Sequence, residues 1–252
     1  MSENASRPLE GKVVAITGAS SGIGEATALA CAQAGASVAL AARRAERLTA
    51  LVKKIEDDGG QAIAIPTDIT DEAQARNFIT QTHSSLGQVD VLINNAGVML
   101  LGPIVGPPIE DWQRMVDLNI LGLLYTTHAA LPLMIESGGG HIINVSSVAG
   151  KAVAPGGGVY SMTKFAVAAF SEGLRQELMN DGVRVTLIEP GRVETELIDH
   201  VDPELRKVID ARWVGVTPLN AGDIATAILY ALTQPEHVIV NQIALRSTIS
   251  PI

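Results

Sequence analysis

Short apolar runs alternate along this chain with longer segments that have the periodicity of helices. Runs without polar alternation are typical of strands covered on both faces, and helix-length connections between them imply right-handed crossovers in a parallel sheet. The pattern therefore predicts a doubly wound α/β fold with six to seven parallel strands and helices on both faces. The runs of strand length are KVVAIT (12–17), SVALAA (37–42), QAIAIPT (61–67), VDVLIN (89–94), HIINVS (141–146) and VRVTLIE (183–189).

The segments between these runs predict the helices. We expect the fourth helix to be broken near Asn119, and Asp71 and Asp223 stand where N-caps would. Neither a repeat nor a linker interrupts the chain, so we expect one domain over residues 1–252. The predicted helices are 22–35, 45–58, 71–86, 110–136, 160–180 and 221–233, with Gly35, Gly59 and Gly182 at three of the expected ends.

Composition narrows the class of protein. With 252 residues, 47% of them hydrophobic and 18% charged, the chain is long enough to bury one large core. The net charge of −9 argues against nucleic acid or a membrane surface and favours a small-molecule substrate. Cys31 is the only cysteine, so we expect neither a disulfide nor a metal site, and a cytoplasmic location. The polar start MSENASRPLE and the absence of a continuous apolar run of about 18 residues argue against a signal and a membrane span.

A glycine-rich turn follows the first predicted strand. In TGASSGIG (17–24) the glycines permit a tight turn and a close approach of diphosphate, and the helix that follows offers free N–H groups. The spacing Gly-x-x-x-Gly-x-Gly resembles the cofactor motif of the classical short-chain dehydrogenases/reductases. That resemblance implies a single-domain Rossmann fold and a nicotinamide cofactor.

The end of the second strand bears on the choice of cofactor. An NAD-dependent enzyme usually has an acidic residue there, but Arg43 and Arg44 follow Ala42 instead. Guanidinium groups match a 2′-phosphate in geometry and charge, so NADP(H) is favoured over NAD(H). Ser21 stands where many NADP-using relatives have a second basic residue, and the discrimination is therefore expected to be incomplete.

Further motifs carry the resemblance along the chain. NNAG (94–97) and EPGRVETEL (189–197) match family segments that contact the adenine ribose and the nicotinamide carboxamide. Asp68 resembles the family aspartate beside the adenine, although a turn residue is the alternative. The residues expected to bind the cofactor are Gly18, Ser20, Ser21, Gly22, Ile23, Gly24, Arg43, Arg44, Asp68, Ile69, Asn95, Ala96, Gly97, Tyr160, Lys164, Pro190, Gly191, Val193 and Thr195.

Tyr160 and Lys164 lie four residues apart on a predicted helix and therefore share one face. A free tyrosine titrates near pH 10, and an ammonium group beside it would lower the pKa of the phenol. An amphipathic helix with a surface lysine is the alternative. The resemblance adds Ser147, which would position the substrate oxygen, and Asn119, which would hold a relay water. Ser147, Tyr160, Lys164 and Asn119 form the predicted catalytic tetrad.

The family resemblance implies reversible reduction of a ketone or aldehyde to an alcohol, with Tyr160 as the proton donor. An apolar substrate wall and a substrate lid over 194–215 favour a hydrophobic carbonyl compound. Arg192 and His200 could meet a carboxylate, but surface positions are the stronger expectation for both. The expected wall includes Met99, Leu100, Val148, Val153, Leu197 and Trp213.

Two alternatives stay open. IEPG and the tail 237–252 resemble a branch that contains clavulanate dehydrogenase and bacterial 3-hydroxy acid or serine dehydrogenases, so an NADP-dependent dehydrogenase of that kind is one alternative. A non-catalytic, cofactor-sensing protein is the other. The resemblance also implies a homotetramer or homodimer, although core burial explains the apolar residues of 110–136 and 160–180 equally well.

Overall fold

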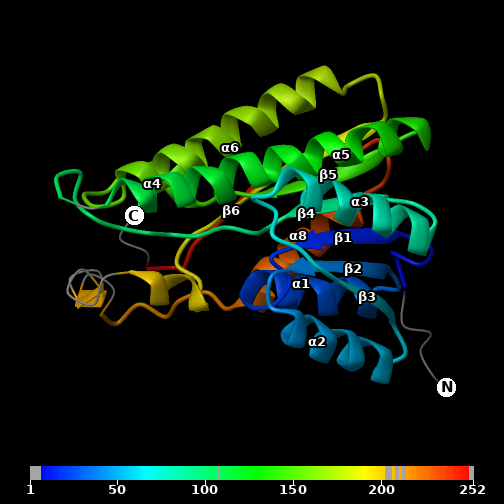
Figure 1. Cartoon of the computed structure of the whole chain (residues 1–252), viewed down its shortest axis with the longest axis horizontal. Helices are drawn as coiled ribbons and strands as arrows, with labels where there is room; N and C mark the ends of the chain where they lie inside the picture. The colour runs from blue at the N-terminus through cyan, green and yellow to red at the C-terminus, as the bar shows by residue number, and fades with distance from the viewer. Residues whose placement is uncertain (1–6, 107, 202–205, 208–209, 212–213, 250–252) are drawn as a thin grey trace.

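A computed structural model describes residues 7–106, 108–201, 206–207, 210–211 and 214–249. Its centre is a parallel seven-stranded sheet in the order β3-β2-β1-β4-β5-β6-β7 (Figure 1). The predicted α/β class and doubly wound arrangement are confirmed, and the sheet has the larger of the two expected strand numbers. The strands are β1 Val13–Thr17, β2 Ser37–Ala42, β3 Gln61–Pro66, β4 Val91–Asn94, β5 Gly140–Val145, β6 Val183–Pro190 and β7 Gln242–Leu245.

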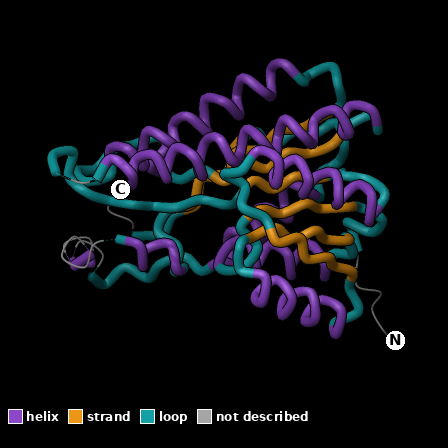
Figure 2. Tube along the Cα trace, in the orientation of Figure 1, coloured by secondary structure: helices purple, strands orange, loops and turns teal. Residues whose placement is uncertain are grey.

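Helices cover both faces of the sheet (Figures 1 and 2). One face carries α1 (Gly22–Gln33), α2 (Ala45–Asp57) and α8 (Ala221–Leu232). The opposite face carries α3 (Glu72–Leu86), α5 (Gly122–Glu136) and α6 (Gly158–Glu177). The remaining described helices are α4 (Ile109–Val116), the π-helical η1 (Asp117–Leu121) and the short 3-10 helices η2 (Val148–Gly150) and η3 (Glu196–His200).

Alternation along β1 shows why the continuous apolar runs form this sheet. Every residue of β1 is buried. Val14 and Ile16 pack into the hydrophobic core beneath α1, α2 and α8, whereas Ala15 packs into the core beneath α3 and α5. Because successive side chains point to opposite faces and both faces are covered, β1 is apolar from Val13 to Ile16. Its last residue, Thr17, is polar and buried, and its hydroxyl forms hydrogen bonds.

The predicted break near Asn119 is confirmed as a π-helical turn between α4 and α5. Together these segments form a helix, Ile109–Glu136, that is long and apolar enough to span a membrane by length and composition alone. In the fold, Ala130 and Met134 of α5 are fully buried in the core that lies on the sheet. This segment is therefore a core helix.

Helix ends follow the prediction in part. The side chain of Asp71 accepts a hydrogen bond from Gln74 N at 3.1 Å and caps α3 as expected. The expected cap at Asp223 is wrong: Asn220 is the N-cap of α8, and Asp223 is its partner in a reciprocal capping box. Gly182 does not end α6, which stops at Glu177. It forms the turn into β6 instead.

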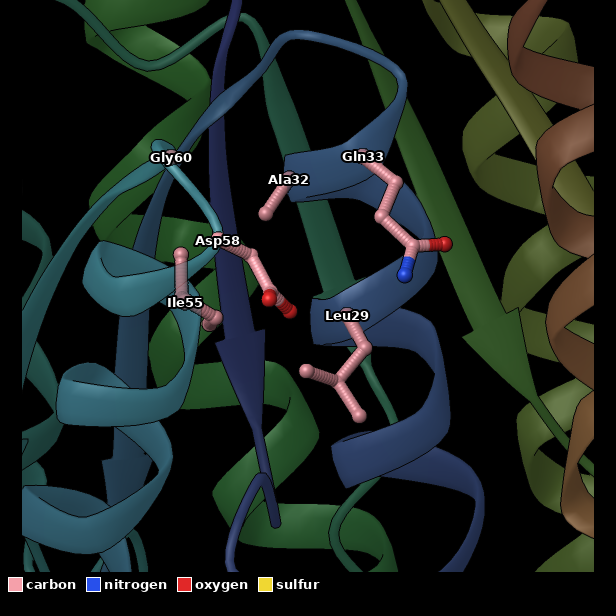
Figure 3. Close-up of a pocket in the computed structure, with 6 residues that line it drawn as sticks. All are labelled: Leu29, Ala32, Gln33, Ile55, Asp58 and Gly60. Carbon is pink, nitrogen blue, oxygen red and sulfur yellow. The ribbon is translucent and has the colours of Figure 1, made fainter.

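A small pocket lies between α1 and α2 (Figure 3). Its volume is about 20 Å³, which is close to the space that one water molecule needs. It cannot hold a dinucleotide or a substrate. The candidate site therefore lies in a much larger cleft at the carboxyl ends of the strands.

Candidate active site

A cleft of about 1110 Å³ opens at the carboxyl edge of the sheet. Loops that follow β1 to β6 line it, as expected where parallel strands all end at one edge. The structure brings together all the predicted cofactor-binding residues in its lining except Gly24. Gly24 is buried beneath the turn, where a Cβ atom would lie 2.3 Å from the carbonyl oxygen of Gly18.

The glycine turn leaves no room for side chains. Gly18 has a φ of +67°, and a Cβ atom there would lie 2.8 Å from Ala96 Cα. The side chain of Ser21, the N-cap of α1, makes no capping hydrogen bond to the first turn of that helix. The first N–H groups of α1 are therefore available to an anion, and the turn fits the diphosphate of a dinucleotide.

Arg44 is held in place by the same turn. Its guanidinium donates to Ser20 Oγ at 3.0 and 2.8 Å and to Ser21 Oγ at 2.7 Å. The third nitrogen of this group donates to Glu196 Oε2 at 2.8 Å, and Arg47 donates to Glu196 Oε1 at 2.6 Å. Arg43 lies beside Arg44 at the cleft. Of the two predicted arginines, Arg44 thus contacts the glycine turn and Arg43 lines the same cleft, whereas Glu196 and Arg47 were not predicted from the sequence.

Hydrogen bonds join the turn to the segment after β4. Asn95 Nδ2 donates to the carbonyl oxygens of Thr17 and Gly18, at 3.0 and 3.3 Å. Thr17 Oγ1 accepts from the backbone N–H groups of Asn95 and Ala96, at 3.0 and 3.1 Å. Thr17 is a positioning residue that the sequence reasoning missed, because a buried threonine at a strand end gives no distinguishing signal.

Asp68 serves the local turn and also lines the cleft. One of its carboxylate oxygens accepts from the backbone N–H of Thr70 at 3.0 Å and from its hydroxyl at 2.8 Å. Both interpretations of Asp68 from the sequence therefore agree with its position.

Tyr160 and Lys164 project from the first turns of α6 and are 7% and 5% exposed. The Lys164 ammonium nitrogen lies 5.8 Å from the centre of the Tyr160 ring. It donates a hydrogen bond to the carbonyl oxygen of Val145 at 3.0 Å, and Ser146 Oγ donates to the Lys164 carbonyl at 2.9 Å. The end of β5 therefore fixes the position of Lys164.

Burial dominates the titration of both groups. It raises the pKa of Tyr160 to about 12, and a side-chain hydrogen bond with Ser147 opposes this rise. Burial also lowers the pKa of Lys164 to about 8. In the protein alone, burial therefore governs the pKa of the phenol, and the expected lowering by the Lys164 ammonium group stays a prediction.

Ser147 and Asn119 flank this pair differently. Ser147 lines the cleft, whereas Asn119 is buried behind it. Asn119 Oδ1 accepts from Val98 N at 2.8 Å, and its Nδ2 donates to the carbonyl of Val98 at 2.9 Å and to Thr163 Oγ1 at 3.1 Å. These bonds join the π-helical turn to α6 and to the loop after β4, so Asn119 positions the helix that carries Tyr160 and Lys164.

A family model for the short chain dehydrogenases matches residues 12–206. The chain belongs to this family. Short-chain dehydrogenases bind a nicotinamide cofactor and act as oxidoreductases. The matched region contains both the glycine turn and the helix that carries Tyr160.

Relatives agree along nearly the whole chain. An uncharacterized oxidoreductase of Staphylococcus aureus (strain MW2) is 41% identical over 238 residues, which is 94% of this chain and 98% of that protein. The closed form of serine dehydrogenase complexed with NADP+ superposes with a TM-score of 0.85 at 34% identity, covering 94% of this chain and 97% of that one. A 7α-hydroxysteroid dehydrogenase complexed with NADH and 7-oxo glycochenodeoxycholic acid gives 0.87 at 30% identity, covering 97% and 96%.

The substrate end of this short-chain dehydrogenase is mainly apolar. Four of the expected wall residues line the cleft: Met99, Val148, Val153 and Leu197. Leu100 does not line it. It packs into the small hydrophobic cluster around Met115, and Leu101 faces the cleft in its place. Trp213 lies outside the described residues.

Charged residues also reach the substrate end. Arg192 lines the cleft and donates to Asp210 at 2.7 Å, so the expected surface position is wrong for this residue. His200 is exposed, as expected, and borders the cleft as well. No group of three or more histidine, cysteine, aspartate or glutamate side chains that could hold a metal ion occurs in the described part of the chain.

Proposed function

We propose that this protein is an NADP(H)-dependent oxidoreductase that interconverts a ketone or aldehyde with the corresponding alcohol. The observation that carries the proposal is that a single cleft contains both the proposed cofactor-binding residues and the proposed catalytic residues. Arg44 meets the glycine turn at one end, and Ser147, Tyr160 and Lys164 converge at the other. The alternative of a cofactor-sensing protein does not account for a buried tyrosine and lysine beside a cleft-lining serine.

The glycine turn and Arg44 would hold a nicotinamide cofactor, which would supply hydride to the carbonyl carbon in the direction of reduction. The Ser147 hydroxyl donates to the carbonyl oxygen and positions it. The Tyr160 hydroxyl gives its proton to this oxygen as negative charge develops there, so the carbonyl compound gains one hydride and one proton and becomes an alcohol. The ammonium group of Lys164 stabilises the resulting phenolate. Asn119 would hold a water that links Lys164 to solvent for reprotonation, as the family resemblance implies.

Arg43 and Arg44 are the basis for preferring NADP(H). The two guanidinium groups lie at the end of β2, where an acidic residue would favour NAD(H). Among the structural neighbours, serine dehydrogenase was solved with NADP+ and the hydroxysteroid dehydrogenase with NADH. Both dinucleotides are thus compatible with this fold, and the arginines favour the phosphorylated one.

The apolar wall favours a hydrophobic carbonyl substrate. The expected lid, 194–215, lies partly outside the described residues. Arg192 supports a second candidate, a 3-hydroxy acid or serine dehydrogenase of the branch that includes clavulanate dehydrogenase, because a guanidinium in the cleft could bind a substrate carboxylate. We further propose a cytoplasmic homotetramer, with the lone cysteine, Cys31, kept as a buried thiol.

The test is NADPH oxidation, and separately NADH oxidation, across aryl ketones, aliphatic aldehydes and β-keto acids. The Tyr160→Phe variant keeps the ring but removes the proton donor, so we expect kcat to fall by about 10²–10⁴-fold while NADPH binding is retained. Tyr230→Phe is the control, because that tyrosine is exposed on α8. Unchanged turnover in Tyr160→Phe would contradict the proposal. A strict need for a substrate carboxylate, lost in Arg192→Gln, would favour the second candidate.

A further inference from the structure

Glu196 lies between two arginines that come from another part of the fold. Its two carboxylate oxygens accept from Arg44 at 2.8 Å and from Arg47 at 2.6 Å. Glu196 begins η3, in the segment after β6, whereas Arg44 precedes α2 and Arg47 lies in its first turn. The carboxylate therefore connects the two sides of the cleft at its cofactor end.

Glu196 carries a negative charge in this cluster. Hydrogen bonds and charge from the two arginines lower the pKa of Glu196 to about 2, so its carboxylate is ionised near neutral pH. All three side chains are nearly half exposed. Exposed ion pairs are weak because water screens them, so a more highly charged anion can displace the carboxylate.

We infer that Glu196 is a specificity-determining residue, an internal anion that competes with the 2′-phosphate of NADP(H) for Arg44. This inference rests on the proposed function, because it takes Arg44 to be the phosphate ligand. A dinucleotide without the 2′-phosphate leaves the Glu196 pairs intact. A phosphate monoester carries a charge of about −1.5 to −2 near neutral pH and repels a carboxylate that shares its guanidinium.

The competition predicts a moderate rather than an absolute preference for NADP(H). The binding free energy that NADP(H) gains from Arg44 is reduced by the cost of displacing Glu196. NAD(H) has no 2′-phosphate and displaces no competing anion. Thr195, the neighbour of Glu196, lies close to the glycine turn, because a Cβ atom on Gly22 would be 3.1 Å from its methyl carbon. The Glu196 carboxylate, which competes for Arg44, is thus held beside the glycine turn.

Calorimetric titration with NADP+, NAD+ and adenosine 2′,5′-bisphosphate tests the inference without relying on turnover. In Glu196→Gln we expect NADP+ and the bisphosphate to bind about three- to tenfold more tightly, with NAD+ affinity unchanged within about twofold. Glu46→Gln is the matched control. This variant also removes one negative charge, here from the first turn of α2, which carries Arg47. In the described structure Glu46 hydrogen-bonds to neither Arg44 nor Arg47. The gain in Glu196→Gln should shrink as salt is raised.

The outcomes separate the inference from the proposed function. If the wild-type protein binds NADP+ no better than NAD+, and Arg44→Gln changes nothing, the cofactor assignment itself fails. If the wild-type protein prefers NADP+ and Arg44→Gln abolishes that preference, but Glu196→Gln binds NADP+ equally or less well, only the role of Glu196 is overturned. A gain of the same size in Glu46→Gln would also overturn it, because the effect would then be general electrostatics.

Discussion

Burial controls the chemistry of Tyr160 and Lys164 at the scale of single residues. Both side chains are almost fully buried, so the charged form of each is disfavoured in the protein alone. The pKa of the phenol therefore rises to about 12 and that of the ammonium group falls to about 8, so burial moves the two pKa values apart. In the proposed reaction Tyr160 gives up and regains a proton, and the charge of its neighbour Lys164 itself depends on pH.

The pH dependence of reduction follows from Lys164. Its pKa in the folded protein is about 8, so the ammonium charge is present below that pH and is lost above it. Because this charge stabilises the phenolate of Tyr160, we expect kcat for carbonyl reduction to decline above about pH 8. Measuring kcat from about pH 6 to pH 10 at saturating NADPH checks this expectation. A rate that stays level to the upper end of this range would contradict it.

Glycines show how much an element depends on its surroundings at the scale of helices and turns. Gly24 lies in the first turn of α1, beneath the glycine turn, and has no space for a methyl group. Gly173 lies on the exposed side of α6, and a Cβ atom there would meet no atom within 4 Å. The same substitution should therefore have opposite effects at the two positions.

Gly173→Ala should stabilise the protein by about 0.5–1 kcal/mol, because alanine loses less conformational entropy than glycine in a helix interior. Gly24→Ala should destabilise it, because the added methyl group would displace the carbonyl of Gly18. Urea unfolding of both variants measures the change in free energy of unfolding. Loss of stability in Gly173→Ala would show that this part of α6 is constrained by contacts beyond the single chain.

Two features belong to the whole molecule. The parallel strands end at one edge of the sheet, and large apolar side chains are exposed on the surface of α6. All seven strands are parallel, so the loops that carry chemistry meet in one cleft. On α6, Met162 and Phe165 are 51% and 43% exposed although they are large and apolar. Leu124 and Phe170 belong to the helical segments 110–136 and 160–180, whose apolar residues could serve either an interface or the core, and both pack against buried core residues.

We expect the protein to form a homotetramer that covers Met162 and Phe165, because exposed apolar side chains on one helix favour association. Light scattering after gel filtration should give four times the mass of one chain. The double variant Met162→Glu/Phe165→Glu should give a smaller assembly, whereas Glu172→Gln on the same helix should not. A monomeric wild-type protein would contradict this expectation.

Much of this protein could be predicted because its signals are local. Continuous apolar runs identify strands covered on both faces, and parallel strands place their carboxyl ends at one edge. The glycine turn, Arg43 and Arg44, Ser147 and the Tyr160–Lys164 pair each follow or begin a predicted element, and the structure brings them to one cleft. The break near Asn119 was likewise visible in the sequence, and the structure shows it as a π-helical turn.

Only the tertiary structure decided what depends on distant contacts and on desolvation. The choice of Asn220 over Asp223 as a cap and of Leu101 over Leu100 as a cleft residue depends on local backbone direction that periodicity does not resolve. The direction of the Tyr160 pKa depends on burial by the surrounding fold. Arg47 and Glu196 are 149 residues apart, and no spacing rule relates them. The sequence determined which groups the cleft contains, and the fold determined which of them share charge, because pairing and desolvation are properties of the packed chain.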